Sequence, residues 1–174
     1  MGCRRTLQVP NDTDLSTWSD DRIWDGLASR LGHGQDGWAL ATGTITDRSV
    51  LPMRSFVQQP MRHGRLFLAG DAAHLVPPTG AKGLNLAVAD VALLAPALTA
   101  LLKGDSALAE AYSDAALRRV WRCTHFSWWM TTMLHSNDDP FDRELQLSQL
   151  RWVASSRAGA AGLAENYAGL PIGF

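Results

Sequence analysis

One stretch of the sequence combines a carboxylate, glycines and the start of a helix in an order that suits a polar ligand. Asp71 follows Gly70 directly after the apolar run 66–69. A carboxylate accepts hydrogen bonds from hydroxyl groups, and the carboxyl end of a buried strand is where open α/β sheets bind their ligands. Gly80 and Gly83 would let the backbone approach a flat ligand closely. The residue types alone leave a second interpretation equally open, in which Asp71 only caps a helix in a Gly/Pro-rich loop.

A long apolar helix is predicted to begin beside this stretch, near Leu84 or Asn85. Free N–H groups in the first turn of such a helix favour negative charge on a ligand. The run 86–102 could be mistaken for a membrane span, but it contains Asp90 and Pro96 and is shorter than the ~20 residues that a bilayer requires. We therefore expect a helix buried inside a larger soluble protein, and no membrane partner.

The run Gly32–Gly37 has the letters of the G-x-G-x-x-G dinucleotide motif, but we expect an ordinary loop there. That motif binds a pyrophosphate because a strand leads into the tight turn and a helix follows it. Here a helix is predicted before the glycines, and strand-like sequence follows them. The elements stand in the wrong order for a dinucleotide site.

The elements that must position these residues predict an α/β fold. The apolar run Leu66–Ala69 ends at Gly-Asp, which indicates a strand buried on both faces in a parallel sheet. Further strands are expected at 7–9, 42–50 and 55–57, and helices at about 20–31, 84–102, 106–121 and 141–154. The tail 158–174 is rich in Gly and Ala and is assigned no element.

The composition narrows the classes of function. A net charge of −1 leaves no basic surplus for gripping phosphates, so nucleic-acid binding is not expected. A hydrophobic content of 46% with 19% charged residues argues against a disordered chain. Cys3 and Cys123 match no metal or redox spacing and suggest reduced thiols in the cytoplasm. The histidines form no ligand spacing, so we predict no metal, and His74 is interpreted as a structural residue.

The segment 65–85 resembles the second flavin-binding segment of the class A flavoprotein aromatic hydroxylases. The similarity extends to the segments 18–20, 51–56, 126–130 and 164–171, and so covers nearly the whole chain. Members of that family are longer and carry the true dinucleotide motif in their N-terminal half. The resemblance therefore implies the C-terminal part of such an enzyme. It also implies FAD as cofactor, NADPH as electron donor, a small phenolic acid hydroxylated beside its hydroxyl group, and a homodimer.

The resemblance also implies a division into three parts. Residues 1–62 would be the end of the substrate-binding domain, and residues 63–104 the second FAD-binding segment. Residues 105–174 would form a helical C-terminal interface domain. Two alternatives stay open: a non-catalytic helical interaction module built on the Trp-rich helices, and a related flavin hydroxylase acting on another phenol.

Matching positions in the family imply roles for individual residues. Asp71 would hold the ribityl chain of FAD, and the backbone from Gly80 to Asn85 would lie along one side of its ring. Arg4 would lie beside the flavin, and Arg54 would help to hold NADPH. The flavin contacts implied in the loop and helix are Gly80, Gly83, Leu84 and Asn85.

Other matches imply a substrate site. The carbonyl of Pro78 would receive the phenolic hydroxyl, with Thr79 beside it. Tyr167 would complete a proton relay from that phenol, since a tyrosine can pass a proton without charging the pocket permanently. Thr6 stands where the family usually has a tyrosine that lines the substrate site, so the identity of the phenol stays open.

Overall fold

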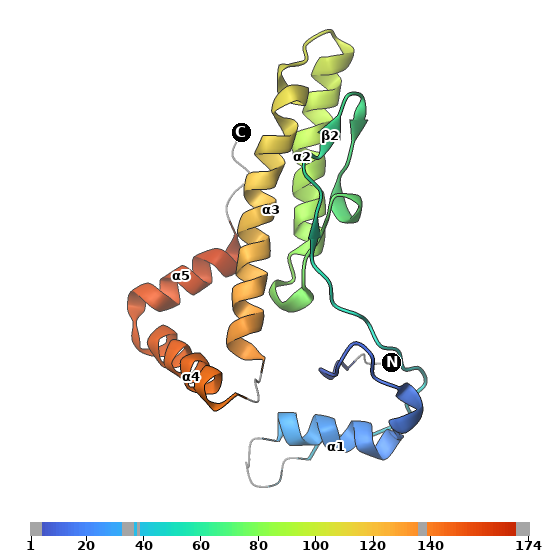
Figure 1. Cartoon of the computed structure of the whole chain (residues 1–174), viewed down its shortest axis with the longest axis vertical. Helices are drawn as coiled ribbons and strands as arrows, with labels where there is room; N and C mark the ends of the chain where they lie inside the picture. The colour runs from blue at the N-terminus through green and yellow to red at the C-terminus, as the bar shows by residue number, and fades with distance from the viewer. Residues whose placement is uncertain (1–4, 33–36, 38, 136–138, 170–174) are drawn as a thin grey trace. The chain divides into compact units, whose positions relative to one another are not determined.

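The computed structural model describes residues 5–32, 37, 39–135 and 139–169. The chain divides into two compact units, Met1–Met53 and Arg54–Phe174. The predicted division at 62/63 and 104/105 stays a prediction. Figure 1 shows the course of the chain.

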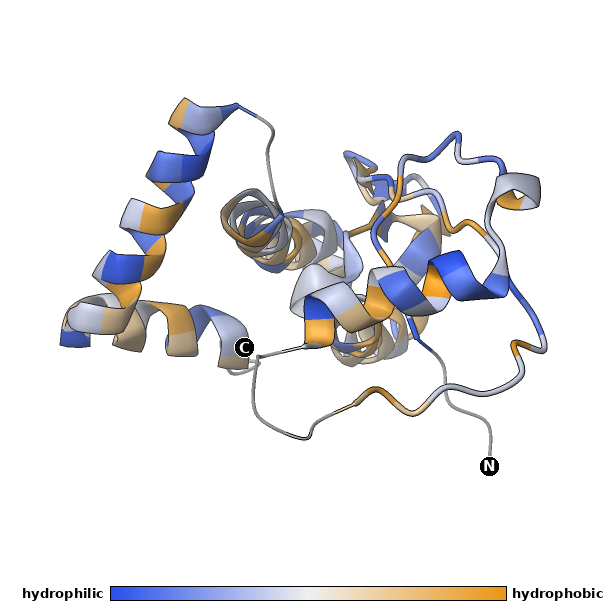
Figure 2. Ribbon diagram, turned by 90° about the horizontal axis from the view of Figure 1, so that it is seen from below, coloured by the Kyte–Doolittle hydropathy of each residue, from blue (hydrophilic) through white to orange (hydrophobic). Residues whose placement is uncertain are grey.

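The first unit contains one α-helix, α1 (Asp20–Leu31), preceded by a 3-10 turn at Leu15–Thr17. Ser19 caps α1 as its sequence predicts, since its hydroxyl accepts a hydrogen bond from the backbone N–H of Arg22 at 3.2 Å. Hydrophilic and hydrophobic residues alternate along α1 (Figure 2), and Leu27 is its buried residue. Arg48 donates to the carbonyl of Trp18 and pairs with Asp20, which fastens the later part of the unit to the start of α1.

The strands predicted at 7–9 and 42–50 do not form. Both predictions rested on β-branched residues and alternation, which describe a strand only when a neighbouring edge accepts its hydrogen bonds. The described part of the first unit offers no such edge, so both segments are irregular.

The second unit is built on a helical hairpin. α2 (Gly83–Leu102) and α3 (Ala107–Leu134) lie side by side and are joined by a four-residue turn (Figure 1). The turn contains Gly104 at a φ of +93°, and the Asp105 carboxylate accepts from the N–H of Ala107 at 3.0 Å. The core between the helices and the preceding segment consists of Met61, Ala73, Leu86, Tyr112, Ala116 and Val120.

Four two-residue strands precede α2, in two antiparallel pairs. β1 (Phe56–Val57) pairs with β4 (His74–Leu75), and β2 (Arg62–His63) pairs with β3 (Leu66–Phe67). The prediction of a buried parallel strand at 66–69 is therefore wrong. Gly64, at a φ of +58°, turns the chain back on itself, and Leu66 is left 60% exposed. We expected an α/β fold, and the described residues form a mostly helical fold with few strands.

Two further helices complete the second unit. α4 (Pro140–Ser155) was predicted, whereas α5 (Arg157–Ala168) was not. Glycines within α5 lower its helix propensity, which hides it from a sequence pattern. A cap stabilises the start of α5: the hydroxyl of Ser156 accepts a hydrogen bond from the backbone N–H of Gly159 at 3.2 Å. Gly159 also lets α5 approach α4, because a Cβ there would lie 3.2 Å from the ring of Trp152.

α2 is also the one helix of the described residues that is long and apolar enough to cross a membrane. Length and composition are the whole of that test, and a single such helix is weak support for a span. Within this chain 22% of the tested window is buried. The expectation that α2 is the core helix of a larger protein stays a prediction.

Candidate functional site

A cavity of about 430 Å³ lies where the segment after β3 meets the N-terminus of α2. It is lined by Asp71, Leu75, Val76, Pro78, Ala81, Lys82, Gly83 and Leu84. The Asp71 carboxylate and the Lys82 ammonium group therefore lie among apolar side chains and the backbone of Gly83. Four residues singled out from the sequence, Asp71, Pro78, Gly83 and Leu84, are thus brought together on one surface.

The backbone of Gly70 sets the position of Asp71. Gly70 has a φ of +60°, and a Cβ there would lie 3.2 Å from the Cβ of Ala87 on α2. Its carbonyl accepts from the N–H of Ala73 at 2.8 Å, which closes the 3-10 turn Gly70–Ala72. Because the turn packs this closely on α2, the exposed Asp71 side chain is held at the rim of the cavity.

The loop after β4 is seated on α3. Gly80 is buried, and a Cβ there would lie 2.9 Å from the Ser127 hydroxyl oxygen. The Thr79 hydroxyl lies 2.8 Å from that of Thr131. Neither Thr79 nor Gly80 lines the cavity, so the requirement for glycine at 80 is explained by helix packing. At Gly83, by contrast, a Cβ would meet nothing within 4 Å.

The N-terminus of α2 is open toward the cavity. No side chain caps it, and Gly83 and Leu84 of its first turn line the cavity. The first N–H groups of an α-helix have no partner within the helix, so they are available to a ligand. Asn85 lies in the same turn and is exposed, but it is not among the lining residues.

Lys82 connects the cavity to α5, and the sequence analysis missed it. The residue is 5% exposed, and its ammonium donates to the backbone carbonyl of Tyr167. The same nitrogen lies 5.4 Å from the ring centroids of both Phe126 and Tyr167. A cation at the carboxyl end of α5 is favourable, since the carbonyls there carry partial negative charge. The only signal in the sequence was a lysine inside a Gly/Pro-rich loop.

Tyr167 lies near this connection rather than in the cavity wall. Its side chain is 56% exposed, and its ring packs edge-on against Phe126 with centroids 6.1 Å apart. Arg54 is exposed and lies two residues before the start of β1. Thr6 belongs to the first unit, and Arg4 lies outside the described residues.

Buried polar groups join the segment around Asp71 to α2 and α3. His74 and Asp90 are both buried, and Nε2 of the histidine lies 2.6 Å from the aspartate Oδ2. The Tyr112 hydroxyl donates to the carbonyl of Leu68 at 2.8 Å. Burial raises the pKa of Tyr112 well above its ordinary value, and the nearby Asp90 charge adds to the effect. His74 was expected to be structural, but Asp90 was noticed only as a charge that interrupts an apolar run.

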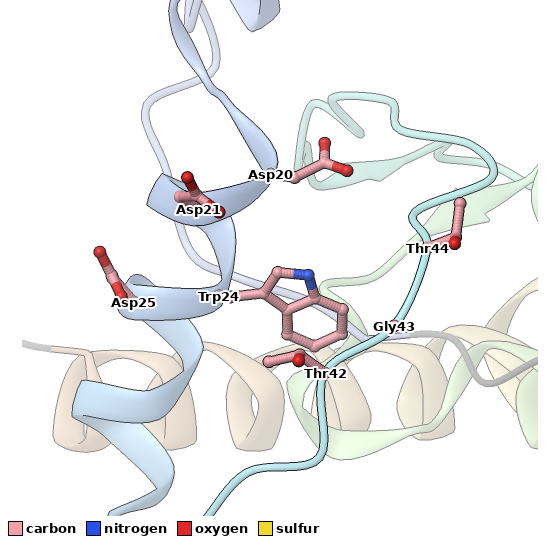
Figure 3. Close-up of a pocket in the computed structure, with 7 residues that line it drawn as sticks. All are labelled: Asp20, Asp21, Trp24, Asp25, Thr42, Gly43 and Thr44. Atoms are coloured by element: carbon pink, nitrogen blue, oxygen red, sulfur yellow. The ribbon is translucent and has the colours of Figure 1, made fainter.

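The first unit contains a separate hollow (Figure 3). Trp24 of α1 points toward the segment Thr42–Thr44, and Asp20, Asp21 and Asp25 lie around it. Three carboxylates would repel a phosphate or a carboxylate ligand. In the described residues no group of three or more His, Cys, Asp or Glu side chains is arranged so that it could hold a metal ion.

Residues 2–127 match the family described as FAD binding domain. The chain belongs to this family. The chain is also similar to curated hydroxylases and monooxygenases, as the sequence resemblance implied. The p-hydroxybenzoate hydroxylase of Acinetobacter baylyi is 47% identical over 171 residues, which are 97% of this chain and 42% of that protein. The aklavinone 12-hydroxylase RdmE of Streptomyces purpurascens is 45% identical over 113 residues, 64% of this chain and 21% of that protein.

A third relative is the tetracenomycin A2 monooxygenase-dioxygenase of Streptomyces glaucescens. It is 36% identical over 107 residues, 58% of this chain and 19% of that protein. The chain therefore spans less than half the length of the curated relatives that it matches. The resemblance to FAD-dependent aromatic monooxygenases is confirmed, and FAD is the cofactor to which the family points.

Proposed function

We propose that this chain forms one wall of the FAD site in an aromatic monooxygenase that hydroxylates 4-hydroxybenzoate, or a closely related phenolic acid, next to its hydroxyl group. The observation that carries the proposal is the cavity that joins Asp71, Pro78, Gly83 and Leu84 at the open end of α2. The 47% identity to a p-hydroxybenzoate hydroxylase over nearly the whole chain supports this choice of substrate class.

The residues of the cavity fit the cofactor. The Asp71 carboxylate is exposed at the rim, where it can accept hydrogen bonds from a polyol chain. Gly83 leaves open space where any other residue would place a Cβ, so a flat ring can approach the backbone. The N–H groups of the first turn of α2 would face the side of the ring that becomes negative.

Bound FAD would supply the activation of O2 by electrons taken from NADPH. The chain's own residues would bind the cofactor, orient the substrate and relay its proton. The carbonyl of Pro78, at the cavity, would accept a hydrogen bond from the phenolic hydroxyl and orient it. Tyr167 would complete the relay that removes the phenolic proton, releasing its own hydroxyl proton as it receives one and so staying neutral; the proton is removed because a phenolate is a stronger nucleophile than the phenol. Lys82 holds Tyr167 through its backbone carbonyl, so the relay is anchored to the cavity loop.

Further parts of the proposal concern the whole enzyme. Arg54 would help to bind NADPH, since a guanidinium matches a phosphate with paired hydrogen bonds. Arg4 would lie beside the flavin, and Thr6 and Thr79 near the substrate. The enzyme would be a cytoplasmic homodimer, with the helices of residues 105–174 at the interface.

The test uses a chimeric enzyme in which this chain replaces the matching 171 residues of the Acinetobacter protein. FAD affinity is measured by fluorescence titration of the apoenzyme. Asp71→Ala should weaken binding about 5- to 150-fold, because a buried hydroxyl left without an acceptor costs ~1–3 kcal/mol. Asp114→Ala, an exposed aspartate on α3, is the matched control and should not change the affinity. Equal affinities for the two variants would refute the assignment of Asp71.

The second candidate function is a non-catalytic interaction module. The observation that favours it is the exposure of three indoles on α3 and α4: Trp121 at 46%, Trp128 at 59% and Trp152 at 53%. A chimera that binds no FAD but associates through this chain, measured by sedimentation, would support the module over the enzyme.

A further inference from the structure

A buried hydrogen-bonded pair, His74 and Asp90, connects the segment around Asp71 to α2. His74 is 2% exposed and Asp90 is 1% exposed. A single carboxylate oxygen, Oδ2 of Asp90, accepts two hydrogen bonds. One comes from Nε2 of His74 at 2.6 Å, and the other from the backbone N–H of Gly70 at 2.9 Å.

The two donors lie on either side of Asp71 in the sequence. Gly70 precedes it and opens the 3-10 turn, and His74 follows it as the first residue of β4. Both ends of this short segment are therefore fastened to one atom on α2, while the carboxylate of Asp71 points outward to the cavity rim. The same helix supplies Gly83 and Leu84 to the cavity, so Asp90 holds the segment that carries Asp71 against the helix whose first turn lines the cavity.

The pair is joined by a short hydrogen bond between Nε2 of His74 and Oδ2 of Asp90. Nδ1 is buried without a hydrogen-bond partner in the described residues. An isolated charge in an apolar helix is costly unless it is paired. Asp90 is paired, and both of its partners belong to the segment that carries Asp71.

We propose that His74 and Asp90 are positioning residues for FAD binding, which hold Asp71 and the N-terminus of α2 in the geometry that the cofactor requires. This inference rests on the proposed function. Neither side chain is among the residues that line the cavity, so neither acts on the cofactor by contact. Their effect is exerted through the backbone of Gly70 and through the register of the turn against α2.

The experiment varies the reach of the donor at position 74 in the same chimeric enzyme. Glutamine places an N–H donor about as far from the backbone as Nε2 of histidine, whereas asparagine is too short to reach Asp90. His74→Asn should weaken FAD binding about tenfold or more, the scale of a lost hydrogen bond to a charged group. His74→Gln should stay within about threefold of the parent, because its donor replaces the lost one. His63→Asn, an exposed histidine in β2, is the control for the substitution itself.

Two further measurements separate the possible outcomes. Far-ultraviolet circular dichroism of the apoenzymes reports whether each variant folds, and Asp71→Ala is titrated alongside. If Asp71→Ala binds FAD as tightly as the parent, the proposed function fails. If Asp71→Ala is weakened while the folded Asn and Gln variants at position 74 bind FAD equally well, the positioning role is overturned. Should His74→Asn fail to fold, the single variant Asp90→Asn replaces it and is compared with His74→Gln. Unchanged FAD affinity of Asp90→Asn also refutes the inference.

Discussion

Replacing Gly70 by alanine should loosen the turn that carries Asp71. The φ of Gly70 is +60°, and a Cβ there would lie 3.2 Å from the Cβ of Ala87. The left-handed backbone costs a non-glycine residue about 1–2 kcal/mol. The crowded Cβ adds about 1–3 kcal/mol, since the turn and α2 must move apart. The reduced entropy of the unfolded chain offsets about 0.4–1 kcal/mol. We expect the free energy of unfolding to fall by about 2–4 kcal/mol.

A second glycine isolates the part of this cost that comes from packing. Gly64, between β2 and β3, has a φ of +58°, but a Cβ there would meet nothing within 4 Å. Gly64→Ala carries the same backbone strain without the contact, so it should cost only about 1 kcal/mol. Urea unfolding followed by far-ultraviolet circular dichroism measures both variants. Equal losses would show that the turn does not pack on α2 as described, and would refute the steric argument.

Four further outcomes are expected. Tyr112→Phe removes the donor to the carbonyl of Leu68 and should lower the free energy of unfolding by about 1 kcal/mol, measured by urea unfolding; no loss would contradict that bond. In the chimeric enzyme, Tyr167→Phe should leave FAD bound but lower the ratio of hydroxylated product to NADPH consumed, with more peroxide released; an unchanged ratio would refute the relay. Burial raises the pKa of Cys123, so in a Cys3→Ser background its alkylation at neutral pH should be slow and should accelerate in denaturant, because less thiolate is present in the folded chain. The chain alone should self-associate and bind FAD weakly, given the exposed apolar side chains along α2, and a soluble monomer with sub-micromolar affinity would contradict this.

The helices were predictable where a cap or a strong pattern marks them. Ser19 before α1 and the long apolar run of α2 are both local signals, and both helices form at the expected residues. α5 was missed because its stability comes from the Ser156 cap and from the approach of Gly159 to Trp152. The contact with Trp152 involves a neighbouring helix, which no periodicity within the segment reveals, whereas the Ser156 cap is a local signal that the glycines and alanines obscured.

The strands show the opposite difficulty. The run at 66–69 has the apolar content of a buried parallel strand, yet β3 pairs with β2 across the turn at Gly64. Apolar content describes what a strand can bury, whereas its partner is decided by which edge lies within reach. Gly64 brings β2 within reach after two intervening residues, so the local hairpin forms.

Several residues of the candidate site were predictable from the sequence, whereas the contacts that explain their positions were not. Asp71, Gly83 and Leu84 line the cavity, and the sequence placed them beside the start of a helix. Gly80 was predicted for close approach to a ligand, but its buried contact with Ser127 already requires a glycine. Lys82 and Asp90 escaped notice because their significance depends on partners that are distant in the sequence, Tyr167 and His74.

The residues that line the cavity all fall within the single run from Asp71 to Leu84, and the α2–α3 hairpin follows it directly. Contacts between near neighbours close short loops, which costs little chain entropy and occurs quickly during folding. The lining residues can therefore meet at little cost in chain entropy, whereas their support by Ser127, Thr131 and Tyr167 depends on contacts that close longer loops. We therefore expect the lining residues to approach one another early in folding, and the contacts with α3 and α5 to fix them later.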